Sequence, residues 1–144
     1  MDKDGPNLSL YDQNGKVRVW LSVDKDGPCL GLADEKGKIR AGLDVFNDVP
    51  SLALWDENGK NRARLAAIKE GSGLTLFDEN EKDRTMLTVL KDGPHLRQYD
   101  ETGEIRFAAG RMYTETPEGK TIAYPESSLI LFGPDGKVIW SAIK

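Results

Sequence analysis

The chain has 144 residues, enough for one ordinary domain and too few for two. Charged residues make up 31% and hydrophobic residues 38%, with 15 Gly and 7 Pro, a composition typical of a folded, turn-rich or repeat protein. Lysine and arginine number 20 against 24 acidic residues. The resulting net charge of −4 excludes a global attraction to nucleic acid or to anionic membranes.

Cysteine, histidine and the apolar runs narrow the function classes further. The single cysteine, Cys29, excludes an internal disulfide, and together with the single histidine, His95, it excludes the usual Cys/His zinc sites. No run reaches the ~18–20 apolar residues that a membrane span requires. We therefore expect no nucleic-acid partner and no direct membrane insertion.

A repeat of 22 residues dominates the chain. Its L-x-L pairs begin at Leu8, Leu30, Leu52, Leu74 and Leu96, and a sixth copy begins 33 residues later at Leu129. Two polar columns keep the same spacing: Asp12, Asp34, Asp56, Asp78 and Asp100, and Arg18, Arg40, Arg62, Arg84 and Arg106. Two turn columns are mostly glycine: Gly15, Gly37, Gly59 and Gly103 with Glu81 once, and Gly5, Gly27, Gly71 and Gly93 with Val49 once. Five copies in register establish a tandem repeat.

Each copy predicts a β-hairpin. In the first copy, residues 12–16 carry turn chemistry, since Asp favours the first turn position and Gly accepts a positive φ. Residues 17–23 place Val or Leu at every second position, as a half-buried strand does. Residues 24–28 turn the chain again. The repeat thus predicts seven residues of strand, four of turn, seven of strand and four of turn. Because residues 2–5 match the second turn, we also expect a strand before residue 2 in the natural protein.

Parity sets the expected register. Opposed residues of a hairpin share a face, so the loop must have an even length if the leucines and valines are to lie together. A four-residue loop over 13–16 sets Leu10 opposite Val19, and the second turn sets Leu21 opposite Leu30. The sequence therefore predicts a continuous antiparallel meander of about twelve strands, built from six hairpin repeats, with one apolar face.

The apolar face determines the expected fold class, because the area of the face far exceeds the few hundred Å² of contiguous apolar surface that a monomer leaves exposed. The face must therefore be covered. We expect an all-β domain over residues 1–144, closed on itself as a flattened barrel or sandwich. Two alternatives stay open. The sheet winds as a β-solenoid, or copies of the chain pack together as a homo-oligomer, such as a trimer.

The insertion at residues 112–126 is the one aperiodic segment. Its flanks 112–115 and 121–124 are expected to pair as an extended hairpin between copies five and six, with a turn at 116–120. One interpretation makes this hairpin a cap that blunts the sheet edge or closes the core. The other makes it a binding flap, whose candidate contacts are Arg111, Tyr113 and Tyr124.

An aromatic and arginine pattern on the polar face supplies the remaining candidate site. The expected register opposes four pairs: Tyr11 with Arg18, Trp55 with Arg62, Phe77 with Arg84, and Tyr99 with Arg106. As structure, each is a cross-strand cation–π pair contributing about 0.5–1 kcal/mol. As a binding surface, the same row suits a glycan or an acidic polymer. Recurrence in nearly every hairpin favours the structural interpretation.

The residues give little support for a metal site or a catalytic site. Asp24-Lys25-Asp26-Gly27 resembles the start of a calcium loop, yet no bidentate Glu follows at the needed distance. His95 and Cys29 share a repeat column with Asn7, Ser51 and Gly73, which supplies no catalytic partners. We expect no cofactor, no metal and no enzymatic activity.

The consensus L-x-L-x-D-x-x-G-K-x-R, carried by the first three copies and ending in residues 131–140, resembles an uncharacterised group of bacterial proteins with tandem hairpin repeats. Those proteins often follow an N-terminal membrane anchor or coiled coil. The resemblance implies an extracytoplasmic or cell-surface location and names no catalytic residues. More distantly, Tyr11-Asp12-x-x-Gly15-Lys16 is similar to the tyrosine-aspartate repeats of bacterial shell-forming toxins, in which arginine usually takes the place of the turn lysine.

These observations predict a non-catalytic structural or adhesive β-repeat module that self-assembles at the bacterial surface. The alternative is a glycan- or polyanion-binding module that uses the aromatic and arginine row or the inserted hairpin.

Overall fold

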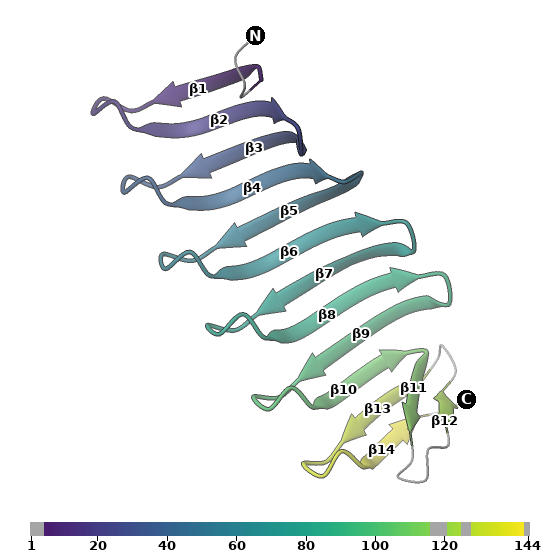
Figure 1. Ribbon diagram of the computed structural model, residues 1–144. Helices are drawn as coiled ribbons and strands as arrows, with labels where there is room; N and C mark the ends of the chain where they lie inside the picture. The colour runs from purple at the N-terminus through teal and green to yellow at the C-terminus, as the bar shows by residue number, and fades with distance from the viewer. Residues whose placement is uncertain (1–4, 116–120, 125–127, 143–144) are drawn as a thin grey trace. The chain divides into compact units, whose positions relative to one another are not determined.

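The computed structural model describes residues 5–115, 121–124 and 128–142. Within them the chain forms fourteen β-strands and no helix (Figure 1). The strands are β1 Asn7–Tyr11, β2 Val17–Asp24, β3 Gly27–Ala33, β4 Ile39–Phe46, β5 Val49–Trp55, β6 Asn61–Ile68, β7 Gly71–Phe77, β8 Asp83–Leu90, β9 Gly93–Tyr99, β10 Ile105–Gly110, β11 Met112–Glu115, β12 Thr121–Tyr124, β13 Leu129–Phe132 and β14 Val138–Ala142. The chain divides into two compact units, unit 1 (Met1–Ile68 with Glu79–Glu81) and unit 2 (Lys69–Asp78 with Lys82–Lys144).

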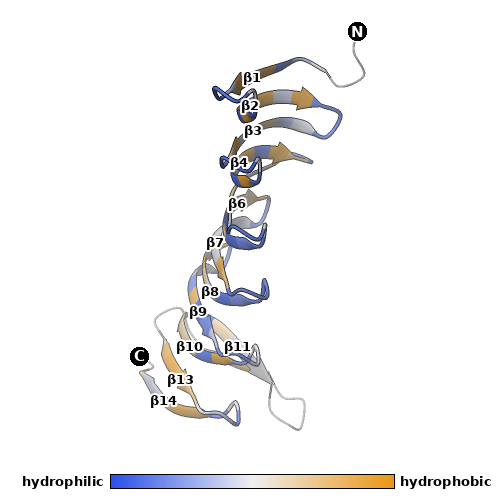
Figure 2. Cartoon of the chain, turned by 90° about the vertical axis from the view of Figure 1, so that its left-hand side faces the viewer, coloured by the Kyte–Doolittle hydropathy of each residue, from blue (hydrophilic) through white to orange (hydrophobic). Residues whose placement is uncertain are grey.

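The predicted meander is confirmed. Twelve strands form one antiparallel sheet in the order β1 to β10, then β13 and β14, while β11 and β12 form a separate two-stranded sheet. The predicted pairs are also found: Leu10 lies opposite Val19, and Leu21 opposite Leu30. Hydrophobic segments follow the strands, and hydrophilic residues gather at the turns (Figure 2).

The predicted closure into a flattened barrel is wrong. Among the described strands β1 pairs only with β2, and β14 only with β13, so the sheet stays open at both edges. The register gives the physical reason. A barrel requires a stagger that accumulates from strand to strand. Here Leu21 lies opposite Leu30, Leu30 opposite Leu43 and Leu43 opposite Leu52, so the register accumulates no stagger across unit 1.

The turn between β1 and β2 differs from the predicted four-residue loop. The Gly15 amide donates to the Asp12 carbonyl at 3.0 Å, and the Asp12 amide donates to the Lys16 carbonyl at 2.9 Å, which leaves a loop of three residues. Gly15 has a φ of 75°, which glycine adopts without steric cost. The Asp12 carboxylate accepts the amides of Asn14 at 2.8 Å and Lys16 at 3.1 Å and so closes the turn.

A β-bulge restores the parity that an odd loop would break. The register shifts between Leu10 and Tyr11, so Tyr11 lies opposite Val17 while Leu10 still lies opposite Val19. Arg18 is the extra residue of the bulge. The shift recurs in the hairpins β3–β4, β5–β6, β7–β8, β9–β10 and β13–β14. The apolar residues therefore share a face, as predicted, by a different local route.

The second turn type is shorter than predicted, with two loop residues in place of four. Asp24 pairs with Gly27, and Phe46 pairs with Val49. In the β4–β5 turn both loop residues adopt a left-handed conformation, Asn47 at φ 49° and Asp48 at φ 63°, as a type I′ turn requires. At Gly27 a Cβ atom would lie 2.1 Å from the main-chain oxygen of Val45, so this position needs glycine.

Buried hydrophobic side chains gather in unit 2. Strand β11 pairs with β12 from Met112 opposite Tyr124 to Glu115 opposite Thr121. Met112 and Tyr124 form a core cluster with Ala108, Ile130 and Phe132, in which Ile130 is fully buried. The inserted hairpin thus packs on β10 and β13. Residues 116–120 and 125–126 of the predicted insertion lie outside the described residues.

Candidate functional site

The sheet of unit 1 has two chemically distinct faces. The Leu/Val face carries only Leu, Val, Ala and Pro at its paired positions: Leu8, Leu10, Val19, Leu21, Val23, Pro28, Leu30, Leu32, Ala41, Leu43, Val45, Pro50, Leu52, Leu54, Ala63 and Leu65. The opposite polar face carries small, polar, aromatic and arginine side chains. The candidate binding row lies on this polar face.

The aromatic and arginine residues do not oppose each other as predicted. Because of the bulge, Tyr11 lies opposite Val17, Trp55 opposite Asn61, Phe77 opposite Asp83 and Tyr99 opposite Ile105. Each arginine is displaced to the bulge position next to these pairs. The expected direct cross-strand pairing is therefore wrong, although both residue types still recur in register.

Each arginine binds the turn aspartate of its own hairpin. The guanidinium lies 3.5 Å from the carboxylate in Arg18–Asp12, 3.4 Å in Arg40–Asp34 and 4.0 Å in Arg62–Asp56. The pairs Arg84–Asp78 and Arg106–Asp100 repeat the contact in unit 2. The aspartate column and the arginine column of the repeat therefore meet in one ion pair in each of the first five hairpins.

The same arginines also reach the next hairpin. Arg18 Nε donates to the main-chain oxygen of Ala33 at 2.9 Å, and Arg40 Nε donates to that of Trp55 at 3.0 Å. In unit 2, Arg106 donates to the main-chain oxygen of Gly133. Each guanidinium so placed spends its donors on the protein itself, which leaves fewer for an acidic ligand.

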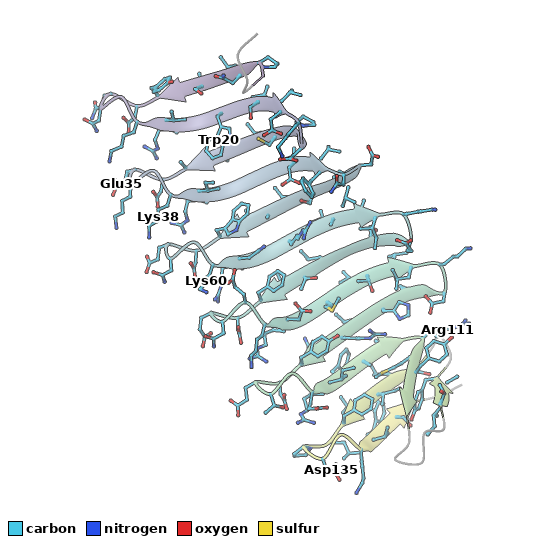
Figure 3. The ribbon with its side chains drawn as sticks, in the orientation of Figure 1. Trp20, Glu35, Lys38, Lys60, Arg111 and Asp135 are labelled. Carbon is cyan, nitrogen blue, oxygen red and sulfur yellow. The ribbon has the colours of Figure 1, made fainter. Side chains whose placement is uncertain are left out.

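Turn lysines make a second set of links, which the sequence reasoning missed. Lys16 Nζ donates to the main-chain oxygen of Glu35 and Lys38 Nζ to that of Glu57, both at 2.8 Å, so each of these turns binds the next. Figure 3 labels Glu35, Lys38 and Lys60 in this row of turns. The recurrence of lysine directly after the turn glycine was the available signal. In unit 1, Lys60 Nζ instead binds the Glu81 carboxylate at 3.1 Å.

Glu81 occupies a turn-glycine position and keeps the glycine-like conformation, with a φ of 61°. An L-residue there costs about 1 kcal/mol in steric strain. Its carboxylate accepts the Asn61 amide at 3.0 Å in addition to binding Lys60. The Asn61 amide, followed by Lys60, holds the pKa of Glu81 below its ordinary value. These contacts offset the strain.

The turn carboxylates share one electrostatic character. Amide donation from Lys16 holds the pKa of Asp12 below its ordinary value, and amide donation from Lys38 does the same for Asp34. For Asp100 the largest cause is the Thr102 hydroxyl, which donates to the carboxylate at 2.6 Å and lowers its pKa. Groups held ionised in this way are suited to structure rather than to proton transfer near neutral pH.

Two tryptophans lie over glycines of neighbouring strands. A Cβ atom on Gly31 would lie 1.9 Å from Cζ2 of Trp20, and one on Gly42 would lie 3.1 Å from Cη2 of Trp55. Both rings are half-buried on the polar face. Each ring therefore lies against the backbone of the neighbouring strand, where a side chain larger than glycine would crowd it. The expected pairing of Leu21 with Leu30 implies that Trp20 lies opposite Gly31, as the structure shows.

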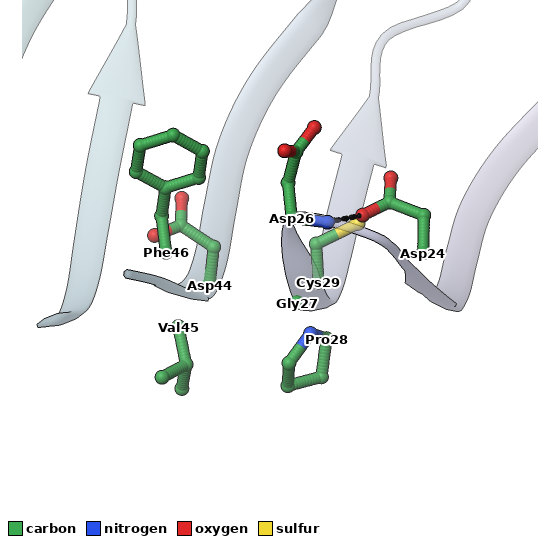
Figure 4. A pocket seen from close by; sticks show the side chains of 8 residues that line it. All are labelled: Asp24, Asp26, Gly27, Pro28, Cys29, Asp44, Val45 and Phe46. Atoms are coloured by element: carbon green, nitrogen blue, oxygen red, sulfur yellow. Dashed lines mark hydrogen bonds between the residues drawn. The ribbon is translucent and has the colours of Figure 1, made fainter. Parts of the chain in front are cut away.

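The column of Cys29 forms small polar contacts. Cys29 Sγ lies 3.1 Å from Ser22 Oγ, and Ser51 Oγ donates to Asp44 Oδ1 at 2.8 Å. Beside Cys29 lies a shallow pocket of about 180 Å³, also lined by Asp24, Asp26, Gly27, Pro28, Asp44, Val45 and Phe46 (Figure 4). Over the described part of the chain no three His, Cys, Asp or Glu side chains are placed to hold a metal ion.

His95 and the inserted hairpin meet in unit 2. The His95 ring is 4% exposed, with Nδ1 at 2.6 Å from the Arg111 carbonyl and Nε2 at 3.1 Å from Asp92 Oδ1. Of the predicted flap contacts, Tyr124 is buried in the core cluster, whereas Tyr113 is exposed. Of the two tyrosines only Tyr113 is therefore accessible to a ligand, and His95 contacts the chain directly before the inserted hairpin begins.

Comparisons with known proteins assign no family to this chain. Over the residues described, no helix is long and apolar enough to cross a membrane. A scan against protein-family models finds no match, and a search of curated proteins finds no significant match either.

Proposed function

We propose that this chain is a non-catalytic structural β-repeat module that assembles with copies of itself. The observation that carries the proposal is the use of the repeated charged residues. Within unit 1, Arg18 and Arg40 bind the turn aspartate of their own hairpin and the backbone of the next. The turn lysines add a parallel series of links. Side chains used in this way hold hairpins together and leave the Leu/Val face to make contacts with other chains.

A bacterial surface location belongs to the same proposal and rests only on the resemblance of the L-x-L-x-D-x-x-G-K-x-R consensus to anchored repeat proteins. A structural or adhesive role fits a module whose length can grow by whole repeats, because each hairpin binds its neighbours in the same way.

Sedimentation velocity of the purified chain over a wide concentration range tests the proposal. We expect an assembled species larger than one chain of 15.9 kDa. The same sample is applied to a glycan array, on which a purely structural module shows no specific binding. A chain that stays monomeric and binds a defined ligand would overturn the structural proposal.

A second candidate function, recognition of a glycan, is favoured by the placement of Trp20 on Gly31 and Trp55 on Gly42. Sugar rings stack on planar aromatic surfaces, and an uncharged glycan needs no free arginine. In this candidate, Trp55→Ala abolishes binding on the array, whereas Phe46→Ala, which removes an exposed aromatic ring from the end of β4 in the same unit, leaves it unchanged. The absence of any glycan bound by the unmodified chain would exclude this candidate.

A further inference from the structure

His95 is the only histidine of the chain, and it is buried in unit 2, with 4% of the residue exposed. In the four preceding copies the same repeat position is held by Asn7, Cys29, Ser51 and Gly73. The fifth copy therefore differs by an imidazole, and it is also the copy that the inserted hairpin follows. This coincidence indicates a role connected with the hairpin rather than with the repeat.

The ring lies where the insertion leaves the sheet. His95 on β9 is opposite Gly110, the last residue of β10. The Gly110 amide donates to the main-chain oxygen of Ser128 at 3.0 Å, so the chain before the insertion and the chain after it meet at this point. Arg111 stands between β10 and β11 (Figure 3). A bond from His95 to Arg111 therefore holds the base of the inserted hairpin.

Both ring nitrogens of His95 face oxygen atoms that only accept hydrogen bonds. Nδ1 lies 2.6 Å from the main-chain oxygen of Arg111, and Nε2 lies 3.1 Å from Oδ1 of Asp92. A carbonyl oxygen has no proton to donate, and neither has an ionised carboxylate. The hydrogen bond from His95 holds the pKa of Asp92 below its ordinary value, so this carboxylate is ionised at neutral pH. Each of the two contacts therefore requires an N–H on the ring.

Only the protonated imidazole satisfies both contacts. A neutral ring carries one N–H, so it donates either to Arg111 or to Asp92, and its other nitrogen then turns a lone pair toward an oxygen. The protonated ring carries two N–H groups, and its bond to Asp92 is in addition an ion pair. Because the ring is buried, water has little access to replace a lost partner. The geometry of the site is therefore that of the protonated ring.

Charged side chains act on the ring from several elements. Asp92, in the turn between β8 and β9, favours the proton on His95. Arg97, two residues further along β9 on the same face, and Arg111, after β10, oppose it. Thr88, which lies opposite His95 on β8, does not titrate. The contact with Asp92 is therefore the one that must keep the ring protonated.

The turns at the same edge contribute further charges. Lys69, Glu70 and Lys91 line a shallow pocket together with Asp92. Ordinary lysine, arginine and carboxyl groups change charge outside the range of about pH 5–8, whereas histidine changes charge within it. His95 is therefore the group at this site whose charge responds to pH near neutrality.

We propose that His95 is a pH-sensitive latch for the inserted hairpin, in which the protonated ring binds Arg111 and Asp92 together and loss of one proton to solvent breaks one of the two bonds. Both bonds form at low pH, and one is lost as the pH rises through the titration of the ring. The hairpin β11–β12 then opens more readily and exposes Met112 and Tyr124, which pack in the core cluster. This inference concerns unit 2 alone and does not depend on the proposed self-assembly.

The single histidine allows a direct test on the full chain. With nitrogen-15 in histidine only, both ring nitrogens should give N–H signals at about pH 5 and one should lose its proton as the pH is raised. In Asp92→Asn this loss should occur at a lower pH than in the unmodified chain. The matched control is Asp26→Asn, because Asp26 has the equivalent turn position in the second copy and lies in unit 1. The control should leave the titration of the ring unchanged.

Amide exchange measures whether the proton holds the hairpin. Each exchange rate is divided by the intrinsic rate at the same pH, which removes the ordinary pH dependence of exchange. The protection of β11 and β12 should then fall about tenfold between about pH 5 and pH 8, while that of β2 to β4 stays constant. In His95→Gln the side chain has no proton to lose, so the protection of β11 and β12 should no longer depend on pH over this range.

Three results would overturn the latch. A ring with a single N–H at about pH 5 would show that His95 does not bind both oxygens. Constant protection of β11 and β12 while the ring loses its proton would show that other contacts hold the hairpin. An equal loss of protection in β2 to β4 would show a change of the whole chain. If His95→Gln does not fold, the unmodified chain and Asp92→Asn still decide between these results.

Discussion

Arg40 Nε donates a hydrogen bond of 3.0 Å to the main-chain oxygen of Trp55, fifteen residues later in the next hairpin. The same guanidinium lies 3.4 Å from the carboxylate of Asp34 in its own turn. The bulge between Leu32 and Ala33 makes both contacts compatible, because it removes Arg40 from the regular pairing of the strands. One side chain therefore joins a turn, a bulge and the neighbouring repeat.

Replacing Arg40 should weaken unit 1. Arg40→Leu removes the carbonyl hydrogen bond and the partly exposed ion pair, and we expect the free energy of unfolding to fall by about 1–2 kcal/mol. Denaturant titration at fixed protein concentration measures the change. Arg64→Leu is the matched control, because Arg64 is exposed on the same polar face and has no ion pair among the described residues. Equal losses in the two variants would contradict a specific role for Arg40.

Acid should destabilise the protein through the turn aspartates. Their pKa values are held below the ordinary value of 3.8 by amide and arginine contacts, as at Asp12 and Asp34. The unfolded state therefore binds protons first, so stability is fully present above about pH 4 and falls as the pH drops below it. In Asp34→Asn the decline between pH 4 and pH 2 should become shallower, as thermal melts at successive pH values would show. An unchanged slope would mean that Asp34 is not among the groups responsible.

Glu81 separates backbone strain from side-chain contacts. Glu81→Ala and Glu81→Gly both remove the bonds to Asn61 and Lys60, yet only glycine adopts the φ of 61° without strain. We expect the glycine variant to be more stable than the alanine variant by about 1 kcal/mol in denaturant titrations. Equal stabilities would show that this turn relaxes when the glutamate is removed.

The repeat period and the register of the Leu/Val face follow from the sequence because residues 22 apart must meet equivalent neighbours. The bulge at Arg18 did not follow, since a four-residue loop and a three-residue loop with a bulge place Leu10 opposite the same residue, Val19. The apolar pattern is the same for both loops and therefore does not distinguish them. The contacts of Arg18 depend on the bulge, so the predicted pairing with Tyr11 failed with it.

The open sheet was not predictable from the apolar pattern for a different reason. A face of Leu and Val requires a cover, but the pattern is the same whether the cover is the other half of the chain or another copy. The decisive quantity is the stagger between strands, which is set by the exact loop lengths and bulges. Those details were the least certain part of the sequence reasoning, and they determine that Leu21, Leu30 and Leu43 line up straight across the sheet.

Gly31 tests how closely Trp20 packs on the sheet. In Gly31→Ala the new Cβ would lie 1.9 Å from the indole ring, so the ring must move away from the backbone. We expect a shifted tryptophan fluorescence maximum and a loss of about 1–3 kcal/mol in the free energy of unfolding. Gly42→Ala is the control, since its Cβ would lie 3.1 Å from Trp55 and requires a smaller adjustment. A larger effect from Gly42→Ala would contradict the packing described for Trp20.

His95 should determine how firmly the inserted hairpin is attached. Its two ring nitrogens face the Arg111 carbonyl and the Asp92 carboxylate, and the ring is almost wholly buried. His95→Ala leaves both acceptors without this partner, so we expect a loss of about 2–3 kcal/mol in the free energy of unfolding and faster amide exchange in β11 and β12. Cys29→Ala, at the equivalent position in the second copy, should leave exchange in those strands unchanged, because it lies in unit 1. If His95→Ala instead loosened β2 to β4 and spared β11, the contact to Arg111 would not be what holds the hairpin.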